Sequence, residues 1–121
     1  MKTAYLHNKR MNNEVYLLRR KVIALIYEAK KLVDLPRIDV RITDNHSLIA
    51  GAGRVLDNKI WITENFVASR AVVFHEILHA VFGVPHVDGC PLMAPICSNP
   101  SDAVCNQLFV KYAKTFKEFI K

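Results

Sequence analysis

Residues 75–79 of this 121-residue chain read His-Glu-Ile-Leu-His and lie within a mostly apolar stretch. An α-helix places residues i and i+4 one turn apart on the same face, so His75 and His79 can direct both imidazoles at one cation. Glu76 is offset by about 100° around the helix, where its carboxylate can border a metal without binding it. With this spacing the two histidines typically bind zinc and the glutamate is a general base.

The residues after the motif indicate where the helix ends and where a third ligand lies. Phe66–Phe82 is almost entirely apolar or small, Gly83 stands where a helix would stop, and Pro85 follows. His86 comes directly after that turn. Two ligands from a helix and a third from just beyond its end suit a catalytic zinc, whose fourth position is left to water. The predicted Zn²⁺ ligands are His75, His79 and His86, with Asp88 as the alternative third ligand.

A simpler interpretation treats His75 and His79 as buried histidines that are satisfied by hydrogen bonds in a core helix. Polar and charged residues are costly in so apolar a segment unless they have partners. A chance match to the motif is also infrequent in a chain of this composition, on the order of 1 in 100. Both considerations favour the metal site.

The composition is that of one domain spanning residues 1–121. Hydrophobic residues make up 51% of the chain, enough for a modest core. The net charge of +6 fits either solvated lysines or contact with nucleic acid or an acidic partner. No apolar run approaches the roughly 20 residues of a membrane span, and Met1–Arg20 contains no signal-peptide hydrophobic region. We therefore expect a cytoplasmic protein, or one made inside a host cell, without a membrane partner.

The three cysteines, Cys90, Cys97 and Cys105, all lie late in the chain. Their odd number argues against a secreted disulfide framework. Small, partly buried thiols are the favoured interpretation, and a Cys90–Cys97 pair is the alternative.

The first half of the chain predicts a helix followed by a sheet. The helix is expected from Asn12 or Asn13 to about Leu35, where Pro36 ends it. Its apolar stripe consists of Val15, Leu18, Val22, Ile26, Ala29 and Val33. Strict alternation predicts a half-buried strand over residues 37–43. Residues 48–56 and 59–63 are expected to form a hairpin joined by Asp57-Asn58, which tolerates positive φ.

Gly51, Ala52 and Gly53 in the first arm of this hairpin mark either a bulge or an edge strand beside which a peptide can lie extended. Thr63 is expected to cap the metal helix. Residues 87–100 predict an ordered loop. Ser101 should cap a last helix. The apolar stripe of that helix is expected to consist of Val104, Cys105, Leu108, Tyr112, Phe116 and Phe119.

The predicted fold class is α+β, with a small twisted mixed sheet of about three to four strands. An N-terminal helix, an active-site helix and a C-terminal helix complete it. We expect no internal repeat.

With these elements in place, the chain resembles the small His-Glu-x-x-His zinc peptidases, the zincins. It looks most like their metzincin branch, in which H-E-x-x-H-x-x-G-x-x-H is followed by a methionine turn. His75, Glu76 and His79 match position for position. Gly83, His86 and Met93 match in kind, and Cys90–Met93 is similar to the methionine turn. Gly83 and His86 come four and seven residues after His79, where the metzincin pattern has three and six. The glycine followed by Pro-His is also similar to the WLM and SprT-like intracellular proteases, which act on DNA-bound proteins.

The resemblance implies a zinc-dependent metallopeptidase that hydrolyses a polypeptide substrate. Glu76 would be the general base, and Met93 would pack beneath the metal. The substrate-binding edge would be residues 50–56, including Gly51, Ala52 and Gly53.

Two other functional classes fit the same histidines. One is a metal-dependent endoribonuclease of the rRNA-processing type, whose pattern has the same histidine spacing but lacks the glutamate. The basic charge is compatible with it, whereas Glu76 favours the peptidase. The other is a zinc-stabilised binding module without catalysis.

Overall fold

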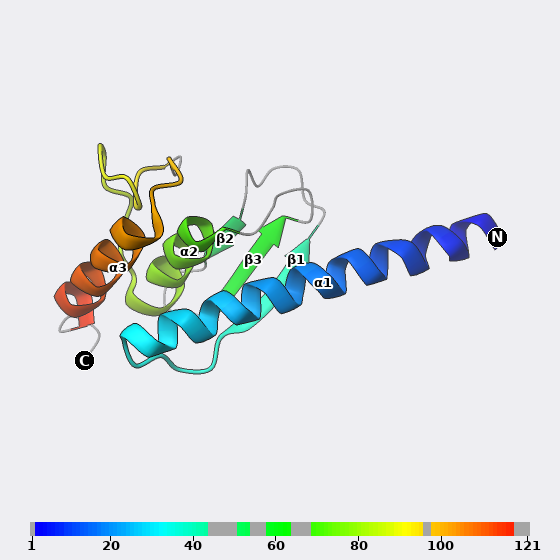
Figure 1. Cartoon of the computed structure of the whole chain (residues 1–121), viewed down its shortest axis with the longest axis horizontal. Helices are drawn as coiled ribbons and strands as arrows, with labels where there is room; N and C mark the ends of the chain where they lie inside the picture. The colour runs from blue at the N-terminus through cyan, green and yellow to red at the C-terminus, as the bar shows by residue number, and fades with distance from the viewer. Residues whose placement is uncertain (1, 44–50, 54–57, 64–68, 96–97, 118–121) are drawn as a thin grey trace.

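The computed structural model describes residues 2–43, 51–53, 58–63, 69–95 and 98–117. It contains six elements, in the order α1 (Lys2–Leu32), β1 (Asp39–Thr43), β2 (Gly51–Gly53), β3 (Lys59–Thr63), α2 (Arg70–Phe82) and α3 (Asp102–Lys117). Figure 1 shows α2 between the sheet and α3, with α1 running beside the sheet. The predicted α+β class and its three helices are therefore present.

The three described strands form one mixed sheet in the order β1-β3-β2. Central β3 pairs with β1 in parallel, with Val40 opposite Ile60, and with β2 in antiparallel fashion, with Ala52 opposite Trp61. The strand predicted over residues 37–43 is present from Asp39, and within it Val40 is buried and Arg41 exposed, as the alternation predicts, whereas the other three residues are half-buried. The hairpin of β2 and β3 is confirmed too, and Asn58 before β3 has a φ of 54°. The flanking parts of the predicted first arm lie outside the described residues.

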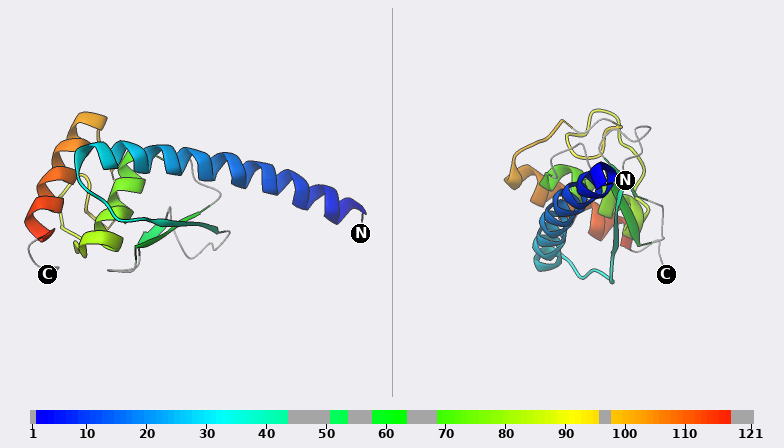
Figure 2. Two further views of the ribbon diagram at one scale, coloured as in Figure 1. Left: turned by 90° about the horizontal axis from the view of Figure 1, so that it is seen from below. Right: turned by 90° about the vertical axis from the view of Figure 1, so that its right-hand side faces the viewer.

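Helix α1 begins at Lys2, so the predicted start at Asn12 or Asn13 is wrong. Asparagine favours a cap but does not require one, and the segment before it contains neither glycine nor proline to stop a helix. The helix also ends at Leu32 rather than near Leu35. Figures 1 and 2 show that the N-terminal half of α1 extends past the sheet. The stripe is accordingly most deeply buried in the C-terminal half of the helix, at Val22, Ile26 and Ala29.

Helix α2 is capped at both ends by its own sequence. Its N-cap is Ser69, whose side chain accepts a hydrogen bond from the Val72 N–H at 3.2 Å. The predicted cap at Thr63 is wrong, because that residue is the buried last residue of β3. Gly83 has a left-handed φ of 67° and donates its N–H to the His79 carbonyl, as predicted. Because α2 contacts α1, α3 and the sheet, it is the centre of the core.

Helix α3 packs along α2. Ser101 caps it by accepting the Val104 N–H at 3.3 Å, as predicted. Its fully buried side chains are Cys105, Phe109 and Ala113, and the ring centroids of Phe109 and Phe74 lie 4.6 Å apart. The predicted stripe is confirmed at Cys105, which is fully buried, and at Leu108, Tyr112 and Phe116, which pack against the core, but it omitted the buried Phe109 and Ala113. Its last member, Phe119, lies outside the described residues.

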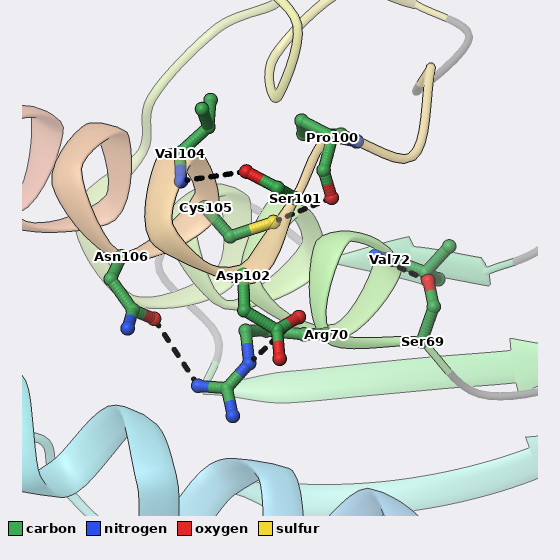
Figure 3. Close-up of polar contacts among 9 residues, drawn as sticks. All are labelled: Ser69, Arg70, Val72, Pro100, Ser101, Asp102, Val104, Cys105 and Asn106. Atoms are coloured by element: carbon green, nitrogen blue, oxygen red, sulfur yellow. Dashed lines mark hydrogen bonds and ion pairs between the residues drawn. The ribbon is translucent and has the colours of Figure 1, made fainter.

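An arginine at the start of α2 fixes the first turn of α3 (Figure 3). The Nη1 atom of Arg70 donates to the side-chain oxygen of Asn106 at 3.2 Å, and its Nε lies 3.4 Å from the Asp102 carboxylate. The guanidinium also lies 5.4 Å from the centre of the Phe74 ring. Because Asp102 is 76% exposed, the ion pair orients α3 more than it stabilises the fold.

Phe109→Ala should lower the free energy of unfolding by about 3–5 kcal/mol, since it removes a fully buried ring and leaves a cavity. The matched control is Gln107→Ala on the exposed side of the same helix, which should change stability by less than about 0.5 kcal/mol. Urea unfolding followed by circular dichroism measures both. Equal stability of the two variants would contradict the packing of α3 on α2 described above.

Candidate metal centre

Three histidines converge at the C-terminal end of α2. His75 and His79 project from successive turns of the helix, and His86 follows the glycine that ends it. One possible ligand atom from each lies within 4.8 Å of the other two. The ring centroids are 4.6, 5.3 and 4.7 Å apart for the pairs 75–79, 75–86 and 79–86. The cluster found among the described residues consists of these three histidines, and Asp88 is not part of it.

His86 comes seven residues after His79, one more than in the metzincin pattern. The turn between these two histidines explains how the additional residue is accommodated. The N–H of Gly83 donates to the His79 carbonyl at 3.2 Å, and the N–H of Val84 donates to the Leu78 carbonyl at 3.0 Å. These two bonds, together with the left-handed glycine, form a helix-ending motif that reverses the chain. The chain therefore returns His86 to the histidine face of α2 despite the longer spacing.

Backbone carbonyls fix the orientation of both helical imidazoles. The Nδ1 atom of His75 lies 2.6 Å from the Leu92 oxygen, and the Nδ1 atom of His79 lies 2.6 Å from the Val84 oxygen. A carbonyl oxygen only accepts, so each Nδ1 must carry the proton and donate it. The Nε2 atoms of both neutral rings are then left with lone pairs. This orientation is the one that metal-binding histidines usually have.

The two Nε2 atoms lie 3.0 Å apart, within hydrogen-bond distance of each other. The pair makes three close contacts, one to each carbonyl and one between the rings, and each contact needs one proton. Two neutral imidazoles carry two protons in total. The third contact must be satisfied either by an extra proton, which makes one ring cationic, or by a metal cation.

Burial opposes the extra proton. Desolvation lowers the pKa of His75, although its hydrogen bond to Leu92 acts in the opposite direction. Burial, with the charge of His75 as a second cause, lowers the pKa of His79 to about 4. At neutral pH both rings are therefore neutral. The three histidines form a group that could hold a metal ion, which would satisfy the facing lone pairs without an extra proton.

The loop after His86 supplies the carbonyl that orients His75. It closes on itself through a bond from the Val87 N–H to the Met93 carbonyl at 2.7 Å and one from the Cys90 N–H to the Val87 carbonyl at 3.1 Å. Gly89, with a φ of 77°, allows the tight bend. Leu92 and Met93 are fully buried, so the loop is ordered as the sequence predicts.

A thiol fastens this loop to α3. Cys90 Sγ accepts hydrogen bonds from the Tyr112 hydroxyl and from the Met93 N–H, both at 3.3 Å. Burial of the thiol opposes its ionisation, but these donors outweigh burial and lower the pKa of Cys90. The same hydrogen bond raises the pKa of Tyr112 to about 12. Cys90 and Cys105 are buried and form no disulfide among the described residues, and Cys97 lies outside those residues.

Two other candidate site features, Glu76 and strand β2, are described by their burial and by their contacts with α2. Glu76 follows His75 on α2 and is only 5% exposed. Strand β2, with Gly51, Ala52 and Gly53, is an edge of the described sheet and lies against α2. His46, a fourth histidine of the sequence, lies outside the described residues.

The sequence did not reveal the groups that orient the ligands. The carbonyls of Leu92 and Val84 carry no sequence signal, because every residue has a backbone oxygen. Tyr112 was assigned only to the apolar stripe of α3. Its hydroxyl was the one hint that this position could also donate a hydrogen bond.

Comparison with models of protein families, with curated proteins and with solved structures finds no match for this chain. Within the described part of the chain, none of the helices combines the length and apolar character needed to cross a bilayer. The site is therefore interpreted from its own geometry.

The metal-free protein should lose stability as the pH falls from 6.5 towards 4. The pKa of His79 is about 4 in the folded chain against 6.5 without the fold. Between these values the unfolded chain binds more protons, so acid favours unfolding. The stabilisation is complete above pH 6.5 and is lost as the pH falls through this window. Urea unfolding in the presence of a chelator, repeated between pH 4.5 and 7.5, measures the effect.

The control for this experiment is His79→Asn, whose amide can still donate to the Val84 carbonyl. Carboxylates titrate in the same range, so the informative quantity is the difference in slope between the two proteins. Stability of the variant should depend less on pH than that of the parent. Identical slopes would show that His79 is not held neutral by burial.

Proposed function

We propose that the chain is a zinc-dependent hydrolase of peptide bonds, with His75, His79 and His86 as the metal ligands. The observation that carries the proposal is the facing pair of Nε2 atoms, 3.0 Å apart and each oriented by a carbonyl behind it. Three imidazole ligands without a thiolate suit Zn²⁺ among the available divalent metals, and three protein ligands leave a position open for chemistry.

When bound, zinc supplies Lewis acidity, which makes a water molecule more acidic and polarises a carbonyl oxygen. With the metal bound, Glu76 would act as the general base, taking a proton from the attacking water and passing it to the amine that leaves when the peptide bond breaks. Its position directly after His75 on the buried helix α2 supports this role, because the residue next to a ligand on a helix is offset by about 100° and can border the metal without binding it. The facing carbonyls of Leu92 and Val84 keep both helical ligands in the metal-binding tautomer throughout.

The position of β2 supports a polypeptide substrate. It is an edge of the described sheet, pairs with β3 on one side and lies against the helix that carries the ligands. An extended peptide can add to such an edge through backbone hydrogen bonds. Gly51 and Gly53 would let that peptide approach closely, since they carry no side chain. Met93, fully buried in the loop behind His75, would then be a packing residue of the site.

Glu76 also ranks this activity above RNA cleavage by the same histidines. The endoribonuclease pattern lacks a carboxylate at this place, whereas peptide hydrolysis needs a group that moves a proton from water to an amine. Assays with structured RNA and with an unfolded protein, each with added zinc, separate the two activities.

The purified chain should bind one Zn²⁺ per molecule, and replacement of any one histidine by alanine should weaken binding by on the order of 100-fold or more, since losing even a supporting hydrogen bond costs 10–100-fold. Competition with a chromogenic chelator measures the affinity. Asp88→Ala serves as the control and should bind zinc like the parent. Equal affinities for His86→Ala and the parent would remove His86 from the site.

Glu76→Gln should keep zinc and lose hydrolysis. The amide cannot accept a proton, and a general base contributes about 10²–10⁴-fold to rate. Cleavage of a fluorescently labelled unfolded protein measures activity, and metal analysis of the same sample measures zinc. Glu14→Gln, the same change at an exposed site on α1, should leave cleavage unaltered. Cleavage by Glu76→Gln at the parent's rate would refute the assigned role.

A further inference from the structure

The charge of the chain is concentrated on one helix. Lys2–Leu32 contains eight of the 17 basic residues and two of the 11 acidic residues, so α1 has a formal charge of +6. The rest of the chain has nine residues of each sign and is neutral overall. The rest of the chain, which includes the three histidines, therefore contributes nothing to the net charge. Solubility alone would not require the net positive charge to lie on one helix.

The sequence of α1 also repeats every 11 residues, contrary to the expectation of no internal repeat. Each repeat begins with a tyrosine and has a basic residue four positions later: Tyr5 and Lys9, Tyr16 and Arg20, Tyr27 and Lys31. Eleven residues make three helical turns to within about 20°, so equivalent positions return to one side of a straight helix. They recur at intervals of about 16.5 Å along the axis.

Side chains in the second and third repeats form paired rings and cations on the outer side of α1. The guanidinium of Arg20 lies 5.9 Å from the centre of the Tyr16 ring, and the ammonium of Lys30 lies 5.3 Å from that of Tyr27. The two tyrosines are 58% and 60% exposed, although the opposite side of the helix is buried. Lys31 pairs with Glu28 at 3.2 Å, an exposed contact that a stronger anion can displace.

We propose that this stripe, defined by Tyr16, Arg20, Lys21, Tyr27, Lys30 and Lys31, binds single-stranded nucleic acid. The basic side chains would contact phosphates, and the exposed ring faces would stack on bases. Basic residues alternating with aromatic rings are how proteins bind single strands without reading sequence. The inference concerns binding alone and does not depend on the metal centre or on hydrolysis.

Other occupants fit the stripe less well. A second copy of α1 would bring another charge of +6 against it, and the repeat has tyrosine and cations where a coiled-coil seam needs aliphatic residues. A membrane-surface helix needs a wide apolar side. Here the apolar side, at Val22, Ile26 and Ala29, is buried in the core, and Leu17 is the exposed large aliphatic residue among the described part of the helix.

The test is fluorescence anisotropy with a labelled 20-nucleotide single strand and the whole 121-residue chain, at 50–200 mM salt. The charge variant R20Q/K21Q/K30Q/K31Q should bind at least tenfold more weakly, with a shallower dependence of affinity on salt. The control R37Q/K59Q/K111Q/K114Q removes the same number of positive charges outside α1 and should bind within twofold of the parent. Similar losses in both variants would overturn the proposal.

The tyrosines are tested separately. Y16A/Y27A should weaken binding at least tenfold while leaving the salt dependence unchanged, whereas Y16F/Y27F, which keeps the rings, should bind like the parent. All substituted residues except Lys59 are exposed, so thermal unfolding should be nearly unchanged in each variant. If Y16A/Y27A binds like the parent, or if polyglutamate or phosphatidylserine vesicles bind more tightly than the oligonucleotide, the stripe is not a nucleic-acid site.

Discussion

The two neutral imidazoles of His75 and His79 carry two N–H protons between them but make three close contacts. The Nε2 atoms of the two rings lie 3.0 Å apart, and the Nδ1–H group of each ring donates a hydrogen bond to a backbone carbonyl oxygen. Nothing in the pair can bridge the gap, and burial makes a third proton unfavourable. A metal ion held by the three histidines would resolve this conflict, and a metal that binds only the folded chain would also stabilise the fold. The carbonyls of Leu92 and Val84 hold the two rings in that arrangement.

The groups that hold the rings come from segments that follow α2 in the chain. Val84 belongs to the turn after the helix and Leu92 to the loop beyond His86, while that loop is fastened to α3 through Cys90 and Tyr112. The packing of Phe109 on Phe74 places α3 where this fastening is possible. The three-histidine cluster is therefore assembled by the C-terminal half of the chain, and a change in the packing of α3 should be transmitted to the histidines through the loop.

One side of helix α1 packs into the core, and the opposite side is exposed to solvent. Its buried residues complete the core against the sheet and α2, and Arg19 donates to the Val40 carbonyl of β1 at 2.8 Å. Its outer side carries the stripe of tyrosines and cations, and the whole net charge of the chain lies on this helix. A body without net charge, which carries the three-histidine cluster, and a cationic helix are thus two physically distinct parts of the chain. Each can be altered by mutation without touching the other.

The sequence by itself determined the features that depend on local spacing. The i, i+4 histidines, the glycine that ends α2, the serine that caps α3 and the alternation of β1 all follow from helix and strand geometry within a few residues. It misplaced the start of α1 and the cap of α2, because several residues can cap a helix and only the packed chain selects one. The sequence also favoured His86 over Asp88 as the third member of the cluster, and the structure brings His86 there. Tertiary structure alone decided that the carbonyls of Leu92 and Val84 orient the rings. These contacts join residues through the backbone, whose oxygens are the same at every position and so leave no trace in the sequence.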